Sequence, residues 1–214
     1  MKYELIVFDM DGTILDTLED LKNSMNYTLK LHNMPERTLD EIRSFVGNGI
    51  RKLIERAVPQ ETSEEKITEI HKNFMAHYEI HCADFTKPYD GVISLIQELR
   101  NRGYKTAVVS NKADSAVQEL CVQYFPNLFD LAIGERSEIA KKPAPDMVHL
   151  ALAQLGFPKE NAVYIGDSDV DVATARNSGL AMIAVDWGFR SRDFLISQGA
   201  ETIVSKPEEI LELV

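Results

Sequence analysis

Residues 8–17 read FDMDGTILDT, and this stretch decides the fold of the chain. It follows an apolar run, residues 3–7, whose length and composition are typical of a buried β-strand. Asp9 and Asp11 lie two positions apart where this strand ends, so both carboxylates project to the same side of the backbone. Two adjacent acids repel each other unless a cation or a shared proton compensates them. Gly12 permits a tight turn that brings main-chain N–H groups close to a ligand. The stretch therefore predicts a site that combines a metal, a nucleophile and an acid/base.

Composition and charge limit the class of protein. The 214 residues include 34 acidic and 23 basic side chains, a formal net charge of −11. We therefore expect neither nucleic acid nor an anionic membrane as a partner, since both require a basic surface. A small anionic substrate remains compatible with this charge. A local cluster of metal, lysine and backbone N–H donors can outweigh the repulsion from distant acidic residues, because salt screens that repulsion. Cys82 and Cys121 lack metal-ligand spacing and are typical of reduced thiols. No apolar run reaches membrane-spanning length and no signal-peptide pattern is present, so we expect a cytoplasmic protein. A chain of this size is compatible with a monomer or a homodimer.

The pattern of predicted elements divides the chain into two parts. After the first strand, hydrophobic residues recur only at helical spacing as far as residue 81, whereas helices and strands alternate from residue 92 onward. Alternating elements favour a mostly parallel sheet with helices on both faces. We expect a doubly wound α/β core, residues 1–15 and 87–214, and an all-helical insertion, residues 16–86, that forms a cap domain.

The expected elements follow from periodicity and from glycine, proline and capping signals. In the insertion, helices are expected near residues 18–31, 39–46, 50–57 and 63–81. In the core, helices are expected at residues 92–102, 113–124, 146–155 and 169–177, after 191 and from 207. Further strands are expected at residues 105–109, 128–133, 162–165, 181–185 and 202–204.

Ligands of open parallel sheets bind beyond the carboxyl ends of the strands, and the polar segments of this chain fall at or near such ends. Asp9 and Asp167 offer hard oxygen ligands, which select Mg²⁺ over softer metals. The Ser110 hydroxyl and the Asn111 N–H are suited to phosphate oxygens, and Lys142 adds positive charge beside a transferring group. These residue types together predict a phosphoryl-transfer site.

The two acids of the first motif have different expected roles. Asp9 is the natural covalent nucleophile, which would give an aspartyl-phosphate intermediate. Asp11 is placed to protonate the leaving oxygen and later to take a proton from water.

In these motifs, and over nearly its whole length, the chain resembles the haloacid dehalogenase (HAD) superfamily. The motifs are DMDGT at residues 9–13 and GDSDVD at residues 166–171. The resemblance implies a Rossmann-like core with a helical cap, bound Mg²⁺ and a phosphoenzyme on the first aspartate. It also implies which residues bind the metal and the phosphate. The metal set is Asp9, Asp11 through its main-chain carbonyl, Asp167 and Asp171. Asp171 either binds the metal directly or orients waters or the lysine beside it, and Gly12 and Thr13 are expected near the substrate. Relatives that displace halide lack the second aspartate, so Asp11 favours a phosphatase.

Within that superfamily the chain resembles the phosphoglycolate phosphatase subgroup. VGNGIR at residues 46–51 is similar to a cap loop that reaches the non-phosphate end of the substrate, which implies contacts from Gly47, Asn48 and Arg51. Alternatively, the glycines of this loop only interrupt a helix. Asp16 has two open interpretations, a helix cap or a substrate contact.

The sequence thus predicts a Mg²⁺-dependent phosphomonoester hydrolase that acts on a small phosphorylated metabolite, with phosphoglycolate as the leading candidate. The alternatives are a pyrophosphatase or nucleotidase of the same subgroup, or a sugar-phosphate mutase similar to β-phosphoglucomutase. A non-catalytic phosphate-binding module is a third class, and its signature would be loss of the acids or the lysine, which are all present.

Overall fold

The computed structural model describes residues 2–214, which form two compact units. One unit combines the chain up to Leu15 with Pro88–Val214, and the other is Asp16–Lys87. Lys87, expected in the α/β core, belongs to the helical unit. Among the described residues, no helix is both long and apolar enough to cross a membrane.

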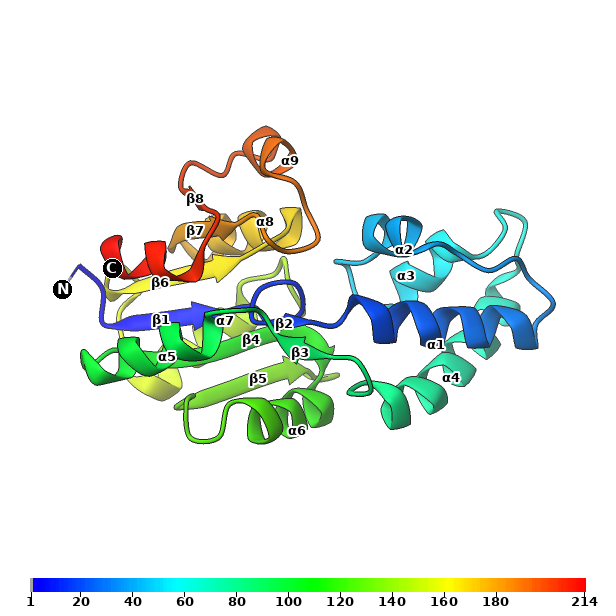
Figure 1. Cartoon of the computed structure of the whole chain (residues 1–214), viewed down its shortest axis with the longest axis horizontal. Helices are drawn as coiled ribbons and strands as arrows, with labels where there is room; N and C mark the ends of the chain where they lie inside the picture. Colours follow the sequence, from blue (N-terminus) through cyan, green and yellow to red (C-terminus); the bar gives the residue numbers. More distant parts are fainter. Residues whose placement is uncertain (1) are drawn as a thin grey trace. The chain divides into compact units, whose positions relative to one another are not determined.

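The α/β unit is built on a six-stranded sheet in which every neighbouring pair is parallel (Figure 1). Phe8, the last residue of the central strand, pairs with Val108 on one side and Ile165 on the other, so the three strands run toward the same carboxyl edge of the sheet. The predicted parallel α/β fold is therefore confirmed. In sheet order the strands are β5 (Leu131–Glu135), β4 (Lys105–Ala113), β1 (Leu5–Phe8), β6 (Ala162–Gly166), β7 (Ala181–Val185) and β8 (Ile203–Val204).

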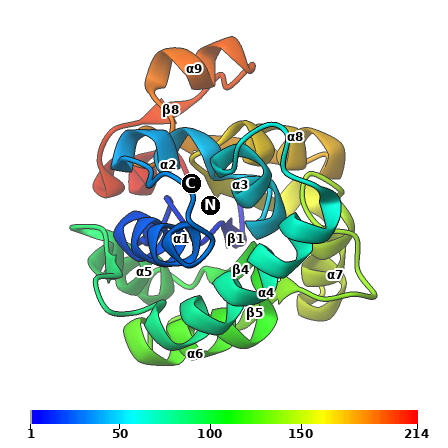
Figure 2. The same cartoon turned by 90° about the vertical axis from the view of Figure 1, so that its right-hand side faces the viewer.

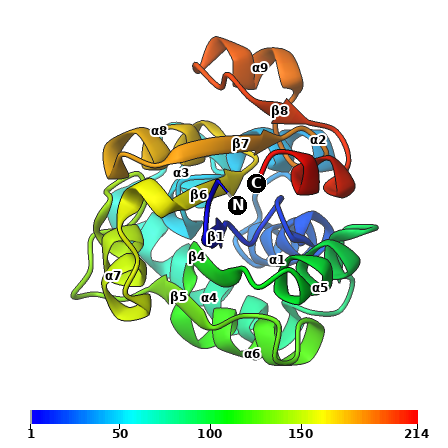
Figure 3. The same cartoon turned by 90° about the vertical axis from the view of Figure 1, so that its left-hand side faces the viewer.

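Helices cover both faces of this sheet (Figure 3). Leu5 and Val7 pack in one buried cluster with Met147 and Ala151, which places α7 on that face next to α8. The opposite face is covered by α5 and by the 3₁₀ helix η2 (Figure 3). The helices are α5 (Val92–Asn101), α6 (Asp114–Tyr124), α7 (Asp146–Leu155), α8 (Asp169–Ser178), α9 (Arg192–Ser197), and the 3₁₀ helices η1 (Lys159–Asn161) and η2 (Pro207–Glu212).

Strand β4 is longer than the sequence predicts. The expected strand ends at residue 109, but β4 continues to Ala113 with a shift in its register to β5. Pairing with β1 stops at Val108, so the extension has β5 as its neighbour in the sheet. Ser110 and Asn111 consequently belong to the strand itself and not to a loop that follows it.

The helical unit contains α1 (Leu18–Leu31), α2 (Leu39–Phe45), α3 (Ile50–Ala57) and α4 (Glu64–His81) (Figure 2). Helix α1 contacts α2 and α4, and α3 contacts the same two helices. The Thr38 side chain caps α2 and the Ser63 side chain caps α4. The chain enters this unit through β2 (Leu15–Asp16) and leaves it through β3 (Lys87–Pro88), and these two strands form a second sheet.

A buried carboxylate joins the two ends of the helical unit. Asp20, in the first turn of α1, is 1% exposed and accepts hydrogen bonds from the N–H groups of Phe85 (3.0 and 3.1 Å) and Thr86 (2.8 Å). These amides follow α4, so Asp20 fixes the return segment against the start of the unit.

We expect Asp20→Ala to lower the free energy of unfolding by about 2–3 kcal/mol, because it leaves backbone N–H groups without their charged acceptor. Denaturant unfolding of the full chain measures this loss. Glu19→Ala is the matched control: Glu19 is the preceding residue, pairs with Lys22, and its side chain is 41% exposed, so its loss should be at most about 1 kcal/mol. Equal losses in the two variants would contradict the assigned role of Asp20.

Candidate active site

The loop after β1 forms a tight turn that places the first motif. The Met10 carbonyl accepts hydrogen bonds from the N–H groups of residues 13–15, at 3.2, 3.0 and 3.0 Å. Gly12 has a φ of 86°, and a Cβ at this position would collide with the Asp167 carboxylate. Glycine is therefore required here both by conformation and by space.

Three buried carboxylates meet at the carboxyl edge of the sheet. Asp9, Asp167 and Asp171 are 7%, 1% and 0% exposed, and one oxygen of each lies within 4.8 Å of the others. The Lys142 ammonium is 2.7 Å from Asp9 Oδ1 and 2.9 Å from Asp171 Oδ1. One ammonium in contact with a cluster of three carboxylates leaves excess negative charge in this region.

Burial and this crowding change the proton affinities of the cluster. Burial, and then the Asp171 carboxylate, raise the pKa of Asp9 to about 7 against the opposing effect of Lys142. Burial, together with the Asp171 and Asp9 carboxylates, raises the pKa of Asp167 well above its usual value. Burial alone would lower the pKa of Lys142, but the two carboxylates that it contacts raise it well above normal. Lys142 therefore remains charged, while the acids favour an additional cation or proton.

Asp171 is held by groups of the protein on both of its oxygens. Oδ1 accepts from Lys142 Nζ (2.9 Å) and the Tyr164 hydroxyl (3.0 Å). Oδ2 accepts from the N–H (3.1 Å) and hydroxyl (2.6 Å) of Ser168. Because four donors occupy this carboxylate, its geometry favours positioning of Lys142 over direct binding of a metal. Tyr164, which also accepts from Lys142 (3.0 Å), was not predicted because it resembles an ordinary core residue in a strand.

Asp167 is oriented by two loops. Its oxygens accept from the Thr13 hydroxyl (3.3 Å) and from the Phe189 N–H (2.7 Å). A Cβ at Gly188 would collide with the Asp167 side chain and with the Gly12 carbonyl. The backbone of the segment after β7 therefore packs directly against the loop that contains Gly12. Neither Gly188 nor Phe189 was predicted as a site residue.

The donor set fits Mg²⁺. Asp9 and Asp167 supply hard carboxylate oxygens in a buried region with excess negative charge, and the Asp11 main-chain carbonyl lies in the same loop. A divalent cation bound here would favour the ionised form of Asp9 and Asp167 and so lower the pKa values that burial and crowding raise.

The end of β4 contributes the predicted phosphate-side residues. Ser110 is buried, and its Oγ accepts from the Lys112 N–H (3.3 Å). Asn111 Nδ2 donates to the Lys142 carbonyl (2.9 Å), next to the cis peptide bond between Lys142 and Pro143. The two strand residues thus lie at the same edge as Lys142 and Asp9.

Sequence reasoning missed Lys112, which contacts the proposed acid/base. Its Nζ lies 3.1 Å from Asp11 Oδ1 and 3.4 Å from Oδ2, and its side chain is 4% exposed. The available signal was its position two residues after Ser110, because alternate residues of a strand project to the same face.

The remaining predicted residues belong to the helical unit. Asp16 Oδ1 accepts from the Leu18 N–H (3.4 Å), which favours the helix-cap interpretation. Asn48 Oδ1 accepts from Arg56 (2.7 Å), and Gly47 has a φ of 123°. These contacts stabilise turns and helix ends within the helical unit.

Arg51 is engaged by neighbouring acids. Its guanidinium lies 3.3 Å from a Glu55 oxygen and 2.5 Å from a Glu64 oxygen. Binding of a substrate anion by Arg51 would therefore compete with these ion pairs.

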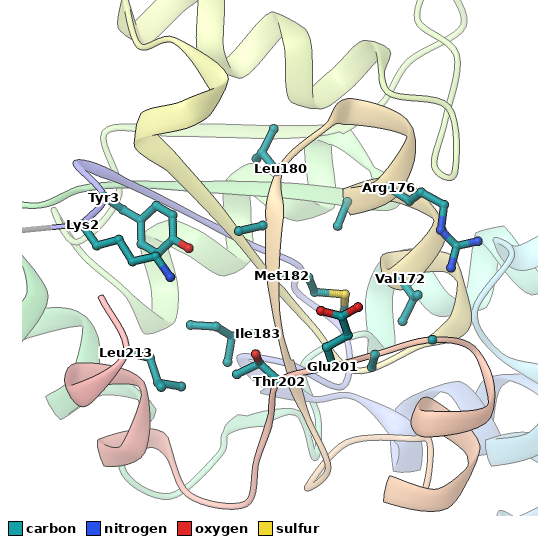
Figure 4. Close-up of a pocket in the computed structure, with 14 residues that line it drawn as sticks. Lys2, Tyr3, Val172, Arg176, Leu180, Met182, Ile183, Glu201, Thr202 and Leu213 are labelled. Carbon is teal, nitrogen blue, oxygen red and sulfur yellow. The ribbon is translucent and has the colours of Figure 1, made fainter.

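A cavity of about 390 Å³ lies elsewhere in the α/β unit (Figure 4). It is lined by Leu180 and Met182 around β7, by Arg176 of α8 and by Leu213 near the C-terminus. The acids and lysines described above do not line this cavity, so it does not form part of the candidate active site.

The chain is similar to known proteins over nearly its whole length. The family model described as haloacid dehalogenase-like hydrolase matches residues 6–185. Phosphoglycolate phosphatase from Aquifex aeolicus is 30% identical over 211 residues, covering 98% of this chain and 96% of the relative. N-acetylmuramic acid 6-phosphate phosphatase from Pseudomonas aeruginosa is 28% identical, covering 100% of this chain and 96% of the relative. The crystal structure of a candidate phosphoglycolate phosphatase from Lactobacillus delbrueckii subsp. bulgaricus superposes with a TM-score of 0.96 at 39% identity, covering 100% and 98% of the two chains.

Proposed function

The chain belongs to the haloacid dehalogenase-like hydrolase family, and from this membership we propose how it acts as a phosphatase. It hydrolyses a small phosphate monoester through a phosphoryl group carried on Asp9, with Mg²⁺ as cofactor. The observation that carries the proposal is the position of Asp9: a buried carboxylate at the end of the central strand, fixed by Lys142 on one oxygen and adjacent to Asp167.

The first chemical step transfers the phosphoryl group. An Asp9 oxygen attacks phosphorus while the bond from phosphorus to the ester oxygen breaks, and Asp11 gives its proton to that oxygen. Lys142 and Ser110 stabilise charge on the transferring group, since an ammonium and a hydroxyl both donate to phosphate oxygens. Mg²⁺ held by Asp9, Asp167 and the Asp11 carbonyl would neutralise phosphate charge.

The second step returns the enzyme to its starting state. Asp11, now ionised, removes a proton from water, and the water oxygen attacks phosphorus as the bond to Asp9 breaks. Inorganic phosphate leaves, and Asp11 again carries the proton. Water must therefore reach Asp9 in this step, and we propose that the helical unit, attached seven residues after it, acts as a cap that controls access.

Phosphoglycolate is the substrate that we propose. Support comes from relatives with that name that cover nearly all of the chain. The carboxylate of phosphoglycolate requires a cation or N–H donors, for which residues 46–51 remain the predicted source. Arg51 would have to exchange its contacts with Glu55 and Glu64 to act in this way.

A phosphate-release screen tests the proposal. The panel is phosphoglycolate, pyrophosphate, nucleoside monophosphates and sugar phosphates, each with Mg²⁺ and with excess EDTA. We expect the highest kcat/KM for phosphoglycolate and a loss of at least about 100-fold on metal removal, because the cation supplies several kcal/mol of charge stabilisation.

The other outcomes identify the alternatives. A preference for pyrophosphate or nucleotides would replace the substrate and keep the chemistry. Isomerisation of a sugar phosphate without phosphate release would indicate a mutase. No Mg²⁺-dependent turnover over the whole panel would contradict catalysis and favour a phosphate-binding module.

A further inference from the structure

We propose that Lys112 is a positioning residue that holds Asp11 in place to deliver a proton to the leaving group. This inference rests on the proposed function, because it assigns a partner to the acid/base of that reaction. Lys112 Nζ lies 3.1 Å and 3.4 Å from the two carboxylate oxygens of Asp11, and this contact is the main support for the proposed role.

The strand register explains how the two residues meet. Strand β1 pairs with β4 only as far as Phe8 and Val108, and β4 then continues past the end of β1. Lys112 lies in this extension, beside the loop that carries Asp11. Ser110 precedes Lys112 by two residues and is joined to it by the N–H to Oγ bond, so one strand segment carries both a proposed phosphate contact and the Asp11 contact.

The burial of the pair favours a defined geometry. The Lys112 side chain is 4% exposed and that of Asp11 is 23% exposed. An ammonium at this depth loses hydration that its hydrogen bonds must replace, whereas exposed ion pairs gain little and sample many geometries. The Asp11 carboxyl is therefore restrained by a lysine that is itself restrained by the strand.

The chemistry of the pair is compatible with proton transfer. A protonated carboxyl keeps one acceptor oxygen, so Lys112 can donate to that oxygen while the other carries the proton. The proton moves from Asp11 to the ester oxygen as its bond to phosphorus breaks, and Lys112 keeps its own protons throughout. Loss of Lys112 would leave the acid present but free to rotate.

Leaving-group dependence distinguishes this role from a structural one. Nitrophenolate leaves as a stable anion, whereas an alkoxide such as that of glycolate needs a proton from the acid. We expect Lys112→Met to lower kcat/KM for phosphoglycolate by about 100-fold and for p-nitrophenyl phosphate by less than about 5-fold, since general acid catalysis contributes about 10²–10⁴-fold. The ratio of the two kcat/KM values does not depend on the fraction of folded enzyme. Lys112→Arg, which keeps a charged donor, should recover part of the ratio.

Two further variants make the outcomes distinct. Lys105→Met, at the opposite end of β4, removes an exposed lysine paired with Asp130 and should leave the ratio unchanged. Asp11→Asn should shift the ratio in the same direction as Lys112→Met. If Asp11→Asn does not shift it, the acid role of Asp11 fails and this inference fails with it. If Asp11→Asn shifts the ratio and Lys112→Met does not, the positioning role alone is wrong.

Discussion

Asp9→Asn is expected to abolish phosphate release, with a loss of at least about 10⁴-fold in kcat. Removal of a covalent nucleophile eliminates the whole reaction path, whereas most substitutions remove only one stabilising contact. Asparagine is close to aspartate in shape and can still accept the hydrogen bond of Lys142 through its amide oxygen. The amide nitrogen is not a comparable nucleophile. Inorganic phosphate release under saturating substrate and Mg²⁺ measures the effect. Turnover near that of the unsubstituted protein would show that another group attacks phosphorus.

The fold of this variant should remain intact, and pH provides the check. Because burial raises the pKa of Asp9 to about 7, the folded protein binds this proton more tightly than the unfolded chain. Without Mg²⁺, stability contributed by Asp9 is therefore present at low pH and is lost as the pH rises from about 4 to about 7. Asp9→Asn should reduce this pH dependence and, at pH 8, unfold no more easily than the original protein. A clear loss of stability at pH 8 would mean that the inactivity reflects misfolding.

Lys142→Met is expected to have the largest effect on stability. Lys142 is 4% exposed and contacts Asp9, Asp171 and Tyr164, so its removal leaves buried carboxylates without their cation. Breaking one side of a buried ion pair costs about 3–5 kcal/mol, and we expect a loss in this range in denaturant unfolding without Mg²⁺. Phosphate release should also fall, because the ammonium is proposed to stabilise the transferring group.

Two variants test the cause of that loss. Lys141→Met removes the neighbouring lysine, which is exposed and paired with Glu135; its effect should be at most about 1 kcal/mol. Adding Asp171→Asn to Lys142→Met removes one of the uncompensated charges, so the double variant should lose less than the sum of the two single losses. Additive losses would indicate that Lys142 contributes by packing and not by charge.

Most helices and buried strands could be predicted closely because their signals are local, but the strand expected at residues 128–133 is β5 at Leu131–Glu135. Helix α7 begins at Asp146 and ends at Leu155, as predicted. It ends there because Gly156 adopts a left-handed conformation. Strand β7 also has the predicted limits. The extent of β4 could not be predicted, because its polar end is stabilised by pairing with β5 and not by its own composition.

The same distinction applies to the site. Asp9 and Asp167 could be proposed from sequence because each directly follows a strand, and the structure places their carboxylates together. The roles of Lys112 and Tyr164 arise from contacts with Asp11 and Asp171 across neighbouring strands and loops. Strand alternation could place Lys112 on the same face as Ser110, but it could not identify Asp11 as its partner. Arg51 shows the converse: its charge suggested an anion site, but acids from α3 and α4 engage it.

The central position of β1 has a consequence for the order of folding during synthesis. This strand is made first, yet its registered partners at Lys105 and Ala162 emerge from the ribosome much later. The helical unit is one continuous segment and is complete before either partner, so we expect it to fold first. Once folded, Asp20 holds the start of the insertion against Phe85. The insertion then acts as a short connector, which reduces the loop entropy that β1 must overcome to pair with β4.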